Sequence, residues 1–315
     1  MPAVQRLIID TDGGIDDAVA LALAVRSPEL SLTAVITSYG NNTLEAATRN
    51  VRAVLGRAGG RPIRVIPGAG TPLSGRVTPP RMAHGPTGMG HVRVDPLPSH
   101  IVPDPAALAR TIVSTPAPIT LITIGPFTNL AHALRSARTA VEERIRTHIA
   151  LGGSGDRRLE HAHPDDFNAL VDPEATGEVQ RSGLRSTYIP LNVARGLMVT
   201  PDDIAATIRS PIPLAAWLSD ALRPYAEYHR GHRNVFGCFL PDVTAVALAI
   251  ASDAFGVRAA RTNLDLDAMN EDDHRDRRLT GGHFSIAVAL ERERVRRLLI
   301  RVFGSVWCER KDGAI

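Results

Sequence analysis

Short apolar segments alternate with amphipathic ones along the first half of the chain. The apolar segments have the length and the bounding turn residues of strands. They span residues 7–10, 32–36, 63–66, 119–124 and 145–151. Segments of helical pattern span residues 16–25, 106–113 and 128–134. A further helix is expected after Asn42 or Thr43, either of which can cap it, with Glu45 in its first turn. This alternation predicts an α/β fold with a mostly parallel central sheet, helices on both faces and a Rossmann-like core.

The second half of the chain carries clearer helix signals than strand signals. Asp172-Pro173 and Pro201-Asp202 start helices, because proline suits the first helical position and aspartate suits the N-terminus. The remaining expected elements are helices at 217–228 and 243–251, an amphipathic segment at 291–301, and two antiparallel strands joined by a polar turn at 270–278. Residues 67–103, rich in proline and glycine, are expected to form a long surface loop. Since no repeat, linker or composition break interrupts the chain, residues 1–315 are interpreted as a single domain.

Composition and charge exclude several classes of protein. Apolar residues make up 44% of the chain and charged residues 22%, as in an ordinary globular protein. No apolar run reaches the roughly 18 residues that a membrane span needs. The two cysteines, Cys238 and Cys308, are too few for a disulfide framework or a cysteine-based zinc site. A net charge of +3 and an aromatic content of 4% do not indicate a nucleic-acid surface. We therefore expect a cytoplasmic protein that binds neither nucleic acid nor membrane.

Four aspartates lie close together at the end of the first predicted strand, in the segment IIDTDGGIDDAVAL. Asp10 and Asp12 precede the Gly13-Gly14 turn, and Asp16-Asp17 opens the next helix. Helix capping accounts for the second pair, because carboxylates stabilise a helix N-terminus, but not for the first. Ligands of parallel sheets bind outside the carboxyl ends of the strands, so the four carboxylates are expected to gather there. Their mutual repulsion needs a positive charge, and a hard cation with oxygen ligands is the simplest candidate.

This segment resembles the Asp-x-Asp-Pro-Gly-x-Asp-Asp signature of the nucleoside hydrolases, with Gly13 in place of the proline. Five further blocks resemble blocks of the same family and follow in the family's order. They read SYGNNTLEAATRN, HGPTGMG, LITIGPFTNLAHAL, DDFNALVDPEA and LPDVTAVALA. Because the six blocks extend over roughly residues 7 to 250, the chain is identified as a member of this family. Its members hydrolyse the N-glycosidic bond of ribonucleosides around a bound calcium ion.

The resemblance implies a calcium-dependent N-ribohydrolase of purine and pyrimidine nucleoside salvage that forms a dimer or tetramer. The implied calcium ligands are Asp12, Asp17, Asp242 and the main-chain carbonyl of Ile124. Asp12 would also be the general base that takes a proton from the attacking water. The implied ribose-binding residues are Asp16, Asn41, Asp166 and Asn168, and His84 is the implied pocket histidine. The reaction would pass through an oxocarbenium-like state, whose positive charge the carboxylates stabilise.

One departure from the family pattern concerns the leaving base. One branch of the family protonates the base with a histidine directly before the last aspartate, but Pro241 stands there in this chain. Proline cannot donate a proton, so His229 and His232, a few residues upstream, are the candidates to replace this acid. The alternative interpretation, which we favour for any single histidine, is that one or both are exposed residues at a helix end. Tyr225 and Tyr228 lie in the same segment, where family members carry residues that face the base.

A second departure concerns the sugar. The family's glutamate is shortened to Asp166, and Glu160 stands where an asparagine is expected. Residues 160–166 are rich in acids and histidines, a composition that suits either a solvated loop at the pocket or a zinc site, and we favour the loop. The chain's two tryptophans, Trp217 and Trp307, lie outside the matched blocks, so base stacking between tryptophans is not expected. A 5′-modified nucleoside or one with an unusual base is therefore a possible ligand.

Two other functions stay open. Pro241 is compatible with a catalytically weak or inactive homologue that binds a ligand without turning it over. The sequence Asp10-Thr11-Asp12-Gly13 partly matches the nucleophile loop of haloacid-dehalogenase-type phosphatases. That match is poor, because Gly14 stands where those enzymes need threonine or valine. The chain's single lysine, Lys311, also lies four residues from the end, which leaves no obvious lysine to hold a phosphate.

Overall fold

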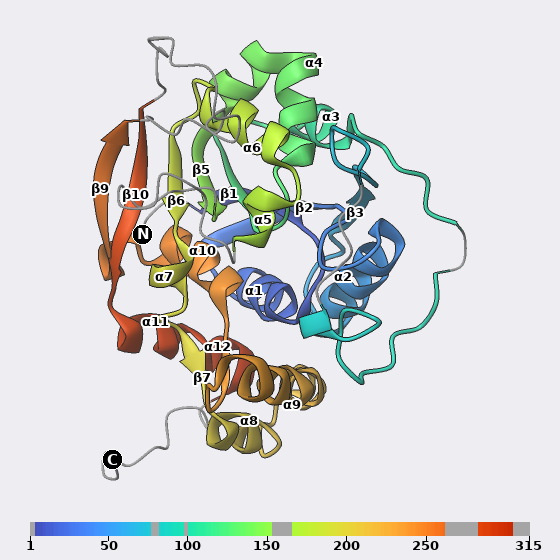
Figure 1. The fold of residues 1–315 in the computed structure, drawn as a ribbon, viewed down its shortest axis with the longest axis vertical. Helices are drawn as coiled ribbons and strands as arrows, with labels where there is room; N and C mark the ends of the chain where they lie inside the picture. The colour runs from blue at the N-terminus through green and yellow to red at the C-terminus, as the bar shows by residue number, and fades with distance from the viewer. Residues whose placement is uncertain (1–3, 77–81, 98–99, 153–165, 262–282, 305–315) are drawn as a thin grey trace, which may run out of the picture.

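Eight strands of the computed structural model form its central sheet (Figure 1). In chain order they are β1 (Gln5–Thr11), β2 (Leu30–Thr37), β3 (Arg64–Pro67), β4 (Ile119–Thr123), β5 (Ile145–Leu151), β6 (Ser186–Ile189), β9 (Phe255–Arg261) and β10 (His283–Leu290). Their spatial order is β3-β2-β1-β4-β5-β6-β10-β9, and every neighbouring pair is parallel except β10 and β9. The structure describes residues 4–76, 82–97, 100–152, 166–261 and 283–304. The predicted α/β fold with a mostly parallel sheet is confirmed.

Helices cover both faces of this sheet (Figure 1). One layer contains α1 (Ile15–Val25), α2 (Leu44–Ala58), α9 (Pro213–Arg233), α10 (Pro241–Ile250), α11 (Arg292–Leu298) and α12 (Ile300–Phe303). The other contains α3 (Ala107–Ser114), α4 (Thr128–Arg144) and α6 (Pro173–Gln180). Shorter pieces are α5 (Phe167–Leu170), α7 (Leu191–Ala194), α8 (Pro201–Thr207), the 3₁₀ turns Met82–His84 and Ser252–Ala254, and the antiparallel pair β7 (Met198–Val199) and β8 (Cys238–Phe239). None of the helices in the described ranges combines the length and apolar character that crossing a bilayer requires.

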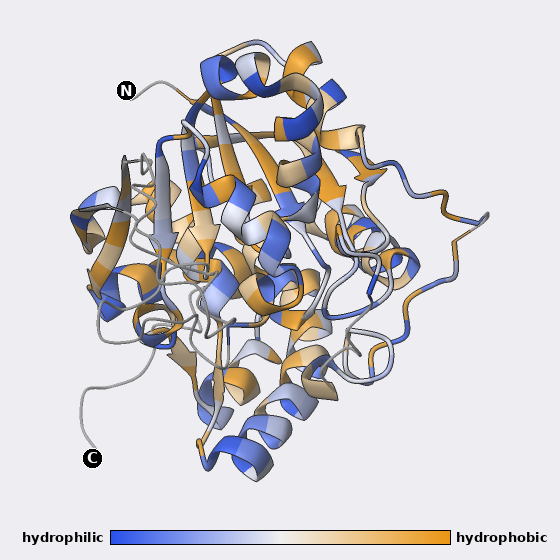
Figure 2. Ribbon diagram, turned by 45° about the horizontal axis from the view of Figure 1, so that its top comes forward, coloured by the Kyte–Doolittle hydropathy of each residue, from blue (hydrophilic) through white to orange (hydrophobic). Residues whose placement is uncertain are grey.

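The hydrophobic pattern of the strands explains the two layers. In β1, Leu7 and Ile9 pack into the core on one face of the sheet, whereas Ile8 packs into the core on the other. This follows from the alternation of side chains along a strand buried on both faces. Figure 2 shows the hydrophobic strands between helices with more polar outer faces. Helix α1 is buried along nearly its whole length, which explains why residues 18–24 are entirely apolar.

The strand order places a binding site between β1 and β4. The first six strands run 3-2-1-4-5-6 across the sheet, so successive connections change direction between these two strands. Open α/β sheets bind ligands in the crevice at such a switch point, outside the carboxyl ends of the strands. Strand β1 ends at Thr11, directly before Asp12, and β4 ends at Thr123, directly before Ile124. The two strand ends lie together, since the Ile124 N–H donates to the Asp10 carbonyl at 2.8 Å.

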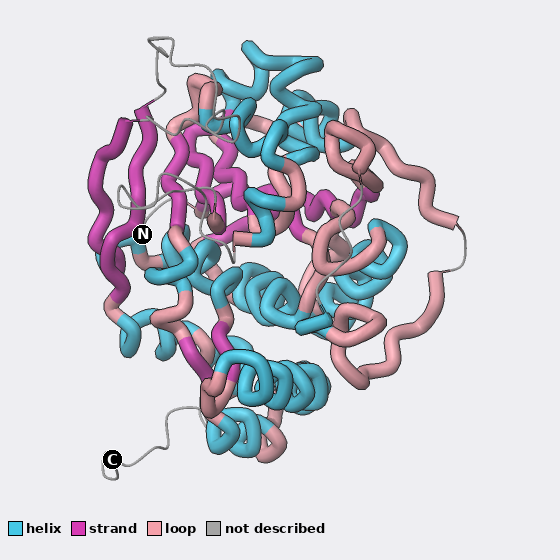
Figure 3. Tube along the Cα trace, viewed as in Figure 1, coloured by secondary structure: helices cyan, strands magenta, loops and turns pink. Residues whose placement is uncertain are grey.

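Several element boundaries differ from the sequence prediction. Helix α4 continues to Arg144, ten residues beyond its predicted end, through a kink at Ala137 with φ −150° and ψ 42°. Strands β6, β7 and β8 were not predicted, because they are only two to four residues long. The helix starts were better predicted, since the Thr43 hydroxyl caps α2 and Asp172 caps α6. Figure 3 shows that the chain between β3 and α3 is mainly loop. The predicted turn at 270–278 lies outside the described residues, but its flanking strands are antiparallel.

Candidate active site

The turn between β1 and α1 depends on two glycines. Gly13 has φ +68°, and a Cβ there would lie 2.7 Å from the Ala47 Cα of α2. Only glycine adopts this conformation without strain, and proline, fixed near −65°, cannot adopt it at all. Proline, which the family carries at this position, therefore does not fit the backbone that Gly13 adopts here. The turn is held from α2 as well, because the Asn50 amide donates to the Gly13 carbonyl at 3.1 Å.

Backbone and hydroxyl groups of this turn orient Asp17. The Gly14 N–H donates to Asp17 Oδ2 at 2.9 Å, and the Thr11 hydroxyl donates to Asp17 Oδ1. Asp12 is held from the other side by Asn41, whose N–H and side-chain amide donate to its two oxygens at 2.7 and 3.0 Å. Both carboxylates are completely buried. Residues from the β2–α2 connection and from the start of α1 thus fix the two aspartates before any ligand binds.

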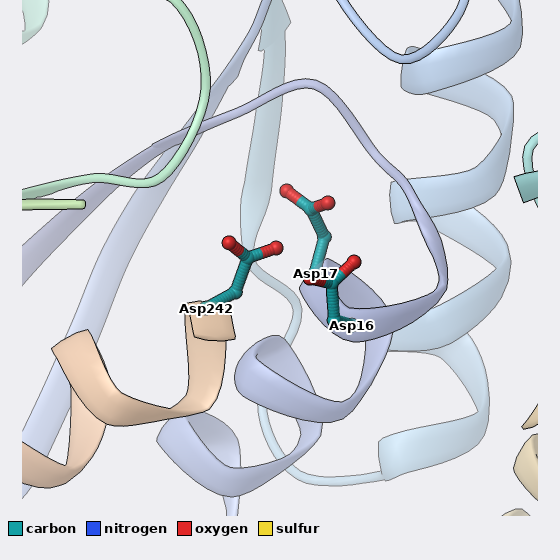
Figure 4. A group of neighbouring side chains, drawn as sticks. All are labelled: Asp16, Asp17 and Asp242. Carbon is teal, nitrogen blue, oxygen red and sulfur yellow. The ribbon is translucent and has the colours of Figure 1, made fainter. Parts of the chain in front are cut away.

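Asp16, Asp17 and Asp242 form a cluster of buried carboxylates (Figure 4). Each offers an oxygen that lies within 4.8 Å of the others. Asp16 and Asp17 come from the first turn of α1, and Asp242 comes from the first turn of α10. Asp16 Oδ1 is buried and makes no hydrogen bond with any described residue. Sequence distance hides this grouping, because α10 begins more than two hundred residues after α1.

Burial and mutual repulsion disfavour the charged forms of these acids. Burial raises the pKa of Asp16 to about 8, and the negative charge of Asp17 adds to the shift. Burial and neighbouring carboxylates also hold the pKa of Asp12 and that of Asp242 well above their ordinary value. A cation among them would reverse this balance by favouring the ionised forms. Buried carboxylate oxygens, one of them without a hydrogen-bond donor, fit a hard divalent cation.

The carbonyl of Ile124 and the side chain of Asn168 meet beside this cluster. The Asn168 amide donates to the Ile124 oxygen at 2.9 Å and to the Leu151 oxygen at 3.4 Å. A carbonyl oxygen has two lone pairs, so Ile124 can accept this bond and still offer a ligand atom. Asp166 caps α5 by accepting from the Ala169 N–H at 3.2 Å, which places Asn168 in the first turn of that helix.

These groups surround a cavity of about 460 Å³. The predicted site residues that line it are Asp16, Asn41, His84, Ile124, Asp166, Asn168, Tyr225, Tyr228, His229, His232 and Asp242. Asp12 and Asp17 lie buried behind this lining. Carboxylates, Asn168 and the Ile124 carbonyl contribute polar groups to its lining, and α9 contributes aromatic rings. The structure therefore brings the predicted residues together around one space.

Rings from α9 stack and pack edge to face along the cavity. Tyr225 stacks on His84 with centroids 5.0 Å apart, and His229 packs edge-on against Tyr225 at 4.5 Å. Tyr228 stacks on His232 at 4.0 Å. The Ile15 N–H donates to His84 Nδ1 at 3.1 Å, so the neutral His84 ring carries its proton on Nε2. Burial lowers the pKa of His84 to about 4, which keeps this ring neutral.

His229 and His232 differ in their surroundings. His229 is buried, whereas His232 is exposed at the C-terminal end of α9, as the helix-end interpretation expected for one of them. Burial lowers the pKa of His229, and the positive charges of Arg233 and Arg195 lower it further. A depressed pKa leaves few His229 rings protonated at neutral pH, which disfavours proton donation from this residue. Pro241 occupies the first turn of α10 and lines the cavity without offering a donor.

Sequence reasoning missed several cavity residues. These are Ala83, Leu151, Phe167, Leu191, Arg195, Arg233 and Phe239. Phe167 could have been found, because it separates the two predicted residues Asp166 and Asn168. Arg195 and Phe239 could not, since they follow α7 and end β8, two elements too short to leave a pattern. Trp217 lies away from this cavity, under the Arg57 guanidinium at 4.7 Å. Trp307 and the acidic, histidine-rich residues 160–165 lie outside the described residues.

Comparisons with known proteins agree with this geometry. The family model described as inosine-uridine preferring nucleoside hydrolase matches residues 7–297. The chain is 34% identical to a pyrimidine-specific ribonucleoside hydrolase of Photobacterium profundum, over 79% of this chain and 81% of the relative. It is 31% identical to uridine nucleosidase 1 of Arabidopsis thaliana, over 80% of this chain and 75% of the relative.

Solved structures are similar over nearly the whole chain. A plant nucleoside hydrolase superposes with a TM-score of 0.82 at 28% identity, covering 95% of this chain and 99% of the other. A purine-preferring ribonucleoside hydrolase of Gardnerella vaginalis superposes with a TM-score of 0.79 at 22% identity, covering 96% and 99%, and this second likeness concerns the fold alone.

Proposed function

Because the chain belongs to the inosine-uridine preferring nucleoside hydrolase family, we propose that it hydrolyses the N-glycosidic bond of a ribonucleoside with the help of a bound calcium ion. The observation that carries the proposal is the cluster of Asp16, Asp17 and Asp242 beside a cavity that is also lined by aromatic rings of α9. Carboxylates suit a sugar and a cation, and aromatic rings suit a base. The phosphatase alternative is dropped, because the family match spans residues 7–297.

Asp12, Asp17, Asp242 and the Ile124 carbonyl would hold the ion. Bound there, the ion supplies the positive charge that offsets the buried carboxylates and makes the attacking water easier to deprotonate. Asp12 accepts the proton of that water, while the two hydrogen bonds from Asn41 keep its carboxylate in place. As the bond to the base lengthens, positive charge develops on the ribose, and the nearby carboxylates stabilise it.

Other polar residues of the cavity orient the ribose. Asp16 has an oxygen without a hydrogen-bond donor among the described residues, so it can accept from a sugar hydroxyl. The Asn168 amide nitrogen is already committed to two carbonyls, which leaves its Oδ1 as an acceptor for another hydroxyl. Asn41 and Asp166 line the same cavity. Holding the ribose in this way places its anomeric carbon between the attacking water and the aromatic rings.

Pro241 favours one second candidate, a homologue that binds nucleosides and turns them over slowly or not at all. Protonation of a leaving group by a positioned side chain is worth about 10²- to 10⁴-fold in rate. Without a residue for this step at position 241, inosine and uridine should react slowly. A substrate with a good leaving group, such as p-nitrophenyl riboside, needs no acid and should react much faster.

The test measures ribose release from uridine, inosine and p-nitrophenyl riboside, with calcium and with a chelator. We expect calcium-dependent release from all three, fastest from p-nitrophenyl riboside. Equal rates for all three would contradict the assignment of a missing acid at Pro241. No release from any substrate, although calcium raises the thermal stability of the protein, would favour the binding protein over the enzyme.

A further inference from the structure

The cavity wall offers His229 to the leaving base. With the ribose beside the carboxylates, as the proposed function requires, the aromatic and basic residues of this wall are left for the base. The polar side chains on that wall include His229, Arg195 and Arg233. His229 packs edge-on against Tyr225 at 4.5 Å and against Phe239 at 5.5 Å, which holds its ring in place.

A hydrogen bond within α9 fixes which nitrogen of His229 carries the proton. Its Nδ1 lies 3.0 Å from the carbonyl oxygen of Tyr225, one turn earlier in the helix. A carbonyl oxygen only accepts hydrogen bonds, so Nδ1 must be the donor. In the neutral ring Nε2 then carries a lone pair and no proton. A side chain in this tautomer can accept a hydrogen bond at Nε2 but cannot give a proton from it.

The Nε2 atom is available to a ligand. No described residue hydrogen-bonds to it. The atom also keeps some accessible surface, because it is not one of the fully buried polar atoms without a hydrogen-bond partner. Only 5% of the residue is exposed, so bulk water has little access, and the residue lines the cavity. His232 makes the same bond to the Tyr228 carbonyl at 3.0 Å but is exposed, so water can satisfy its ring. The depressed pKa of His229 keeps its ring neutral near pH 7.

We propose that His229 is a specificity-determining hydrogen-bond acceptor, which binds a ring N–H of the leaving base through Nε2 instead of protonating the base. Arg233, one helical turn later, and Arg195, after α7, line the same cavity, and a guanidinium carries only hydrogen-bond donors. An acceptor beside arginine donors is complementary to a base whose ring N–H lies next to at least one carbonyl oxygen. Uracil and hypoxanthine have this arrangement, and methylation of that nitrogen removes it.

The experiment compares kcat/KM for uridine and 3-methyluridine, or for inosine and 1-methylinosine, in three proteins. These are the wild type, His229→Leu, which removes the acceptor, and His229→Gln, whose amide oxygen can still accept but which cannot act as an acid. A buried acceptor left without its donor typically lowers the rate about 5- to 150-fold. The wild type should therefore prefer the unmethylated substrate by this factor, His229→Gln should keep most of the preference, and His229→Leu should lose it.

Two references separate the possible outcomes. The p-nitrophenyl riboside has no ring N–H, so its hydrolysis reports separately whether each variant still has a folded, working site. His132→Gln, on α4 and outside the cavity, is the matched control for the substitution itself. If both His229 variants slow uridine and 3-methyluridine equally, His229 acts as an acid or only structurally, and the inference is wrong. If the wild type hydrolyses nothing, including p-nitrophenyl riboside, the proposed function fails instead.

Discussion

Replacing Asp242 by asparagine should stabilise the calcium-free protein, although the residue is buried and central to the site. Asp16, Asp17 and Asp242 offer oxygens within 4.8 Å of one another. Two unit charges at that distance repel by about 3.5 kcal/mol at an effective dielectric constant near 20. Asp16, with a pKa of about 8, is largely protonated at pH 7, and because the pKa of Asp242 is raised as well, one fully ionised pair is the upper limit of the repulsion. Losing a favourable charge at the start of α10 subtracts up to about 1 kcal/mol.

The net gain of at most about 2.5 kcal/mol corresponds to a measurable change in melting temperature. With about 2.1 cal/mol/K of unfolding entropy per residue over 315 residues, the Tm should rise by up to roughly 4 °C in a chelator. Adding calcium should reduce or reverse this difference in Tm between Asp242→Asn and the wild type. At a hundred times its Kd, calcium stabilises the wild type by about 2.7 kcal/mol, and Asp242→Asn should lose most of that because it lacks one ligand.

Thermal unfolding of the wild type and Asp242→Asn, each with chelator and with calcium, tests the expected rise in Tm without calcium and the expected loss of stabilisation by calcium. Asp202→Asn is the matched control, because Pro201-Asp202 starts α8 as Pro241-Asp242 starts α10, but Asp202 is exposed and outside the cluster. It should show neither the gain in chelator nor a changed response to calcium. If Asp242→Asn melts below the wild type in chelator and responds equally to calcium, the carboxylates do not repel each other and Asp242 is not a ligand.

Three further predictions follow from single residues. Asp12→Asn should lower kcat for p-nitrophenyl riboside by about 10²- to 10⁴-fold while thermal unfolding shows a retained fold, and near-native turnover would rule out Asp12 as the general base. Gly13→Ala should destabilise the protein by about 1–3 kcal/mol in urea unfolding, because φ +68° is strained for alanine and its Cβ would meet Ala47; an unchanged midpoint would refute this. Burial lowers the pKa of His148 to about 3, below its ordinary value near 6.5. Between these two pH values the unfolded protein binds a proton at His148 that the folded protein does not, so the folded protein loses stability as the pH falls from 6.5 toward 3. Between pH 6 and 4, His148→Asn should lose stability less steeply than the wild type, by up to about 1.4 kcal/mol per pH unit, and parallel curves would contradict the burial argument.

The amino-acid sequence predicted the parts of the site that depend on local pattern. Asp12, Asp16 and Asp17 follow one another at a strand end, so their grouping could be read directly. Asp242 and Ile124 came only from the resemblance, because no pattern along the chain shows that α10 and the end of β4 meet the start of α1. Strand β4 was nevertheless predicted closely, since its five residues are all buried.

Other features depend on three-dimensional packing and could not be predicted from a pattern. The residue pair Tyr225 and His229 is four residues apart, which allows a bond from the ring to the helix carbonyl, but the burial that makes this bond decisive comes from Phe239 and the cavity wall. The sequence shows that Gly13 replaces the family's proline, but not that its φ is +68° or that Ala47 of α2 leaves no room for a Cβ. Arg195 reaches the cavity from a four-residue helix with no recognisable signature.

A crystal structure of the protein grown with calcium and soaked with ribose tests the central claim most directly. The account predicts one calcium ion about 2.3–2.6 Å from oxygens of Asp12, Asp17, Asp242 and Ile124, with ribose hydroxyls completing its ligands and contacting Asp16 and Asn168. Carboxylates that stay apart without an ion at saturating calcium, or ribose bound away from this cluster, would contradict it.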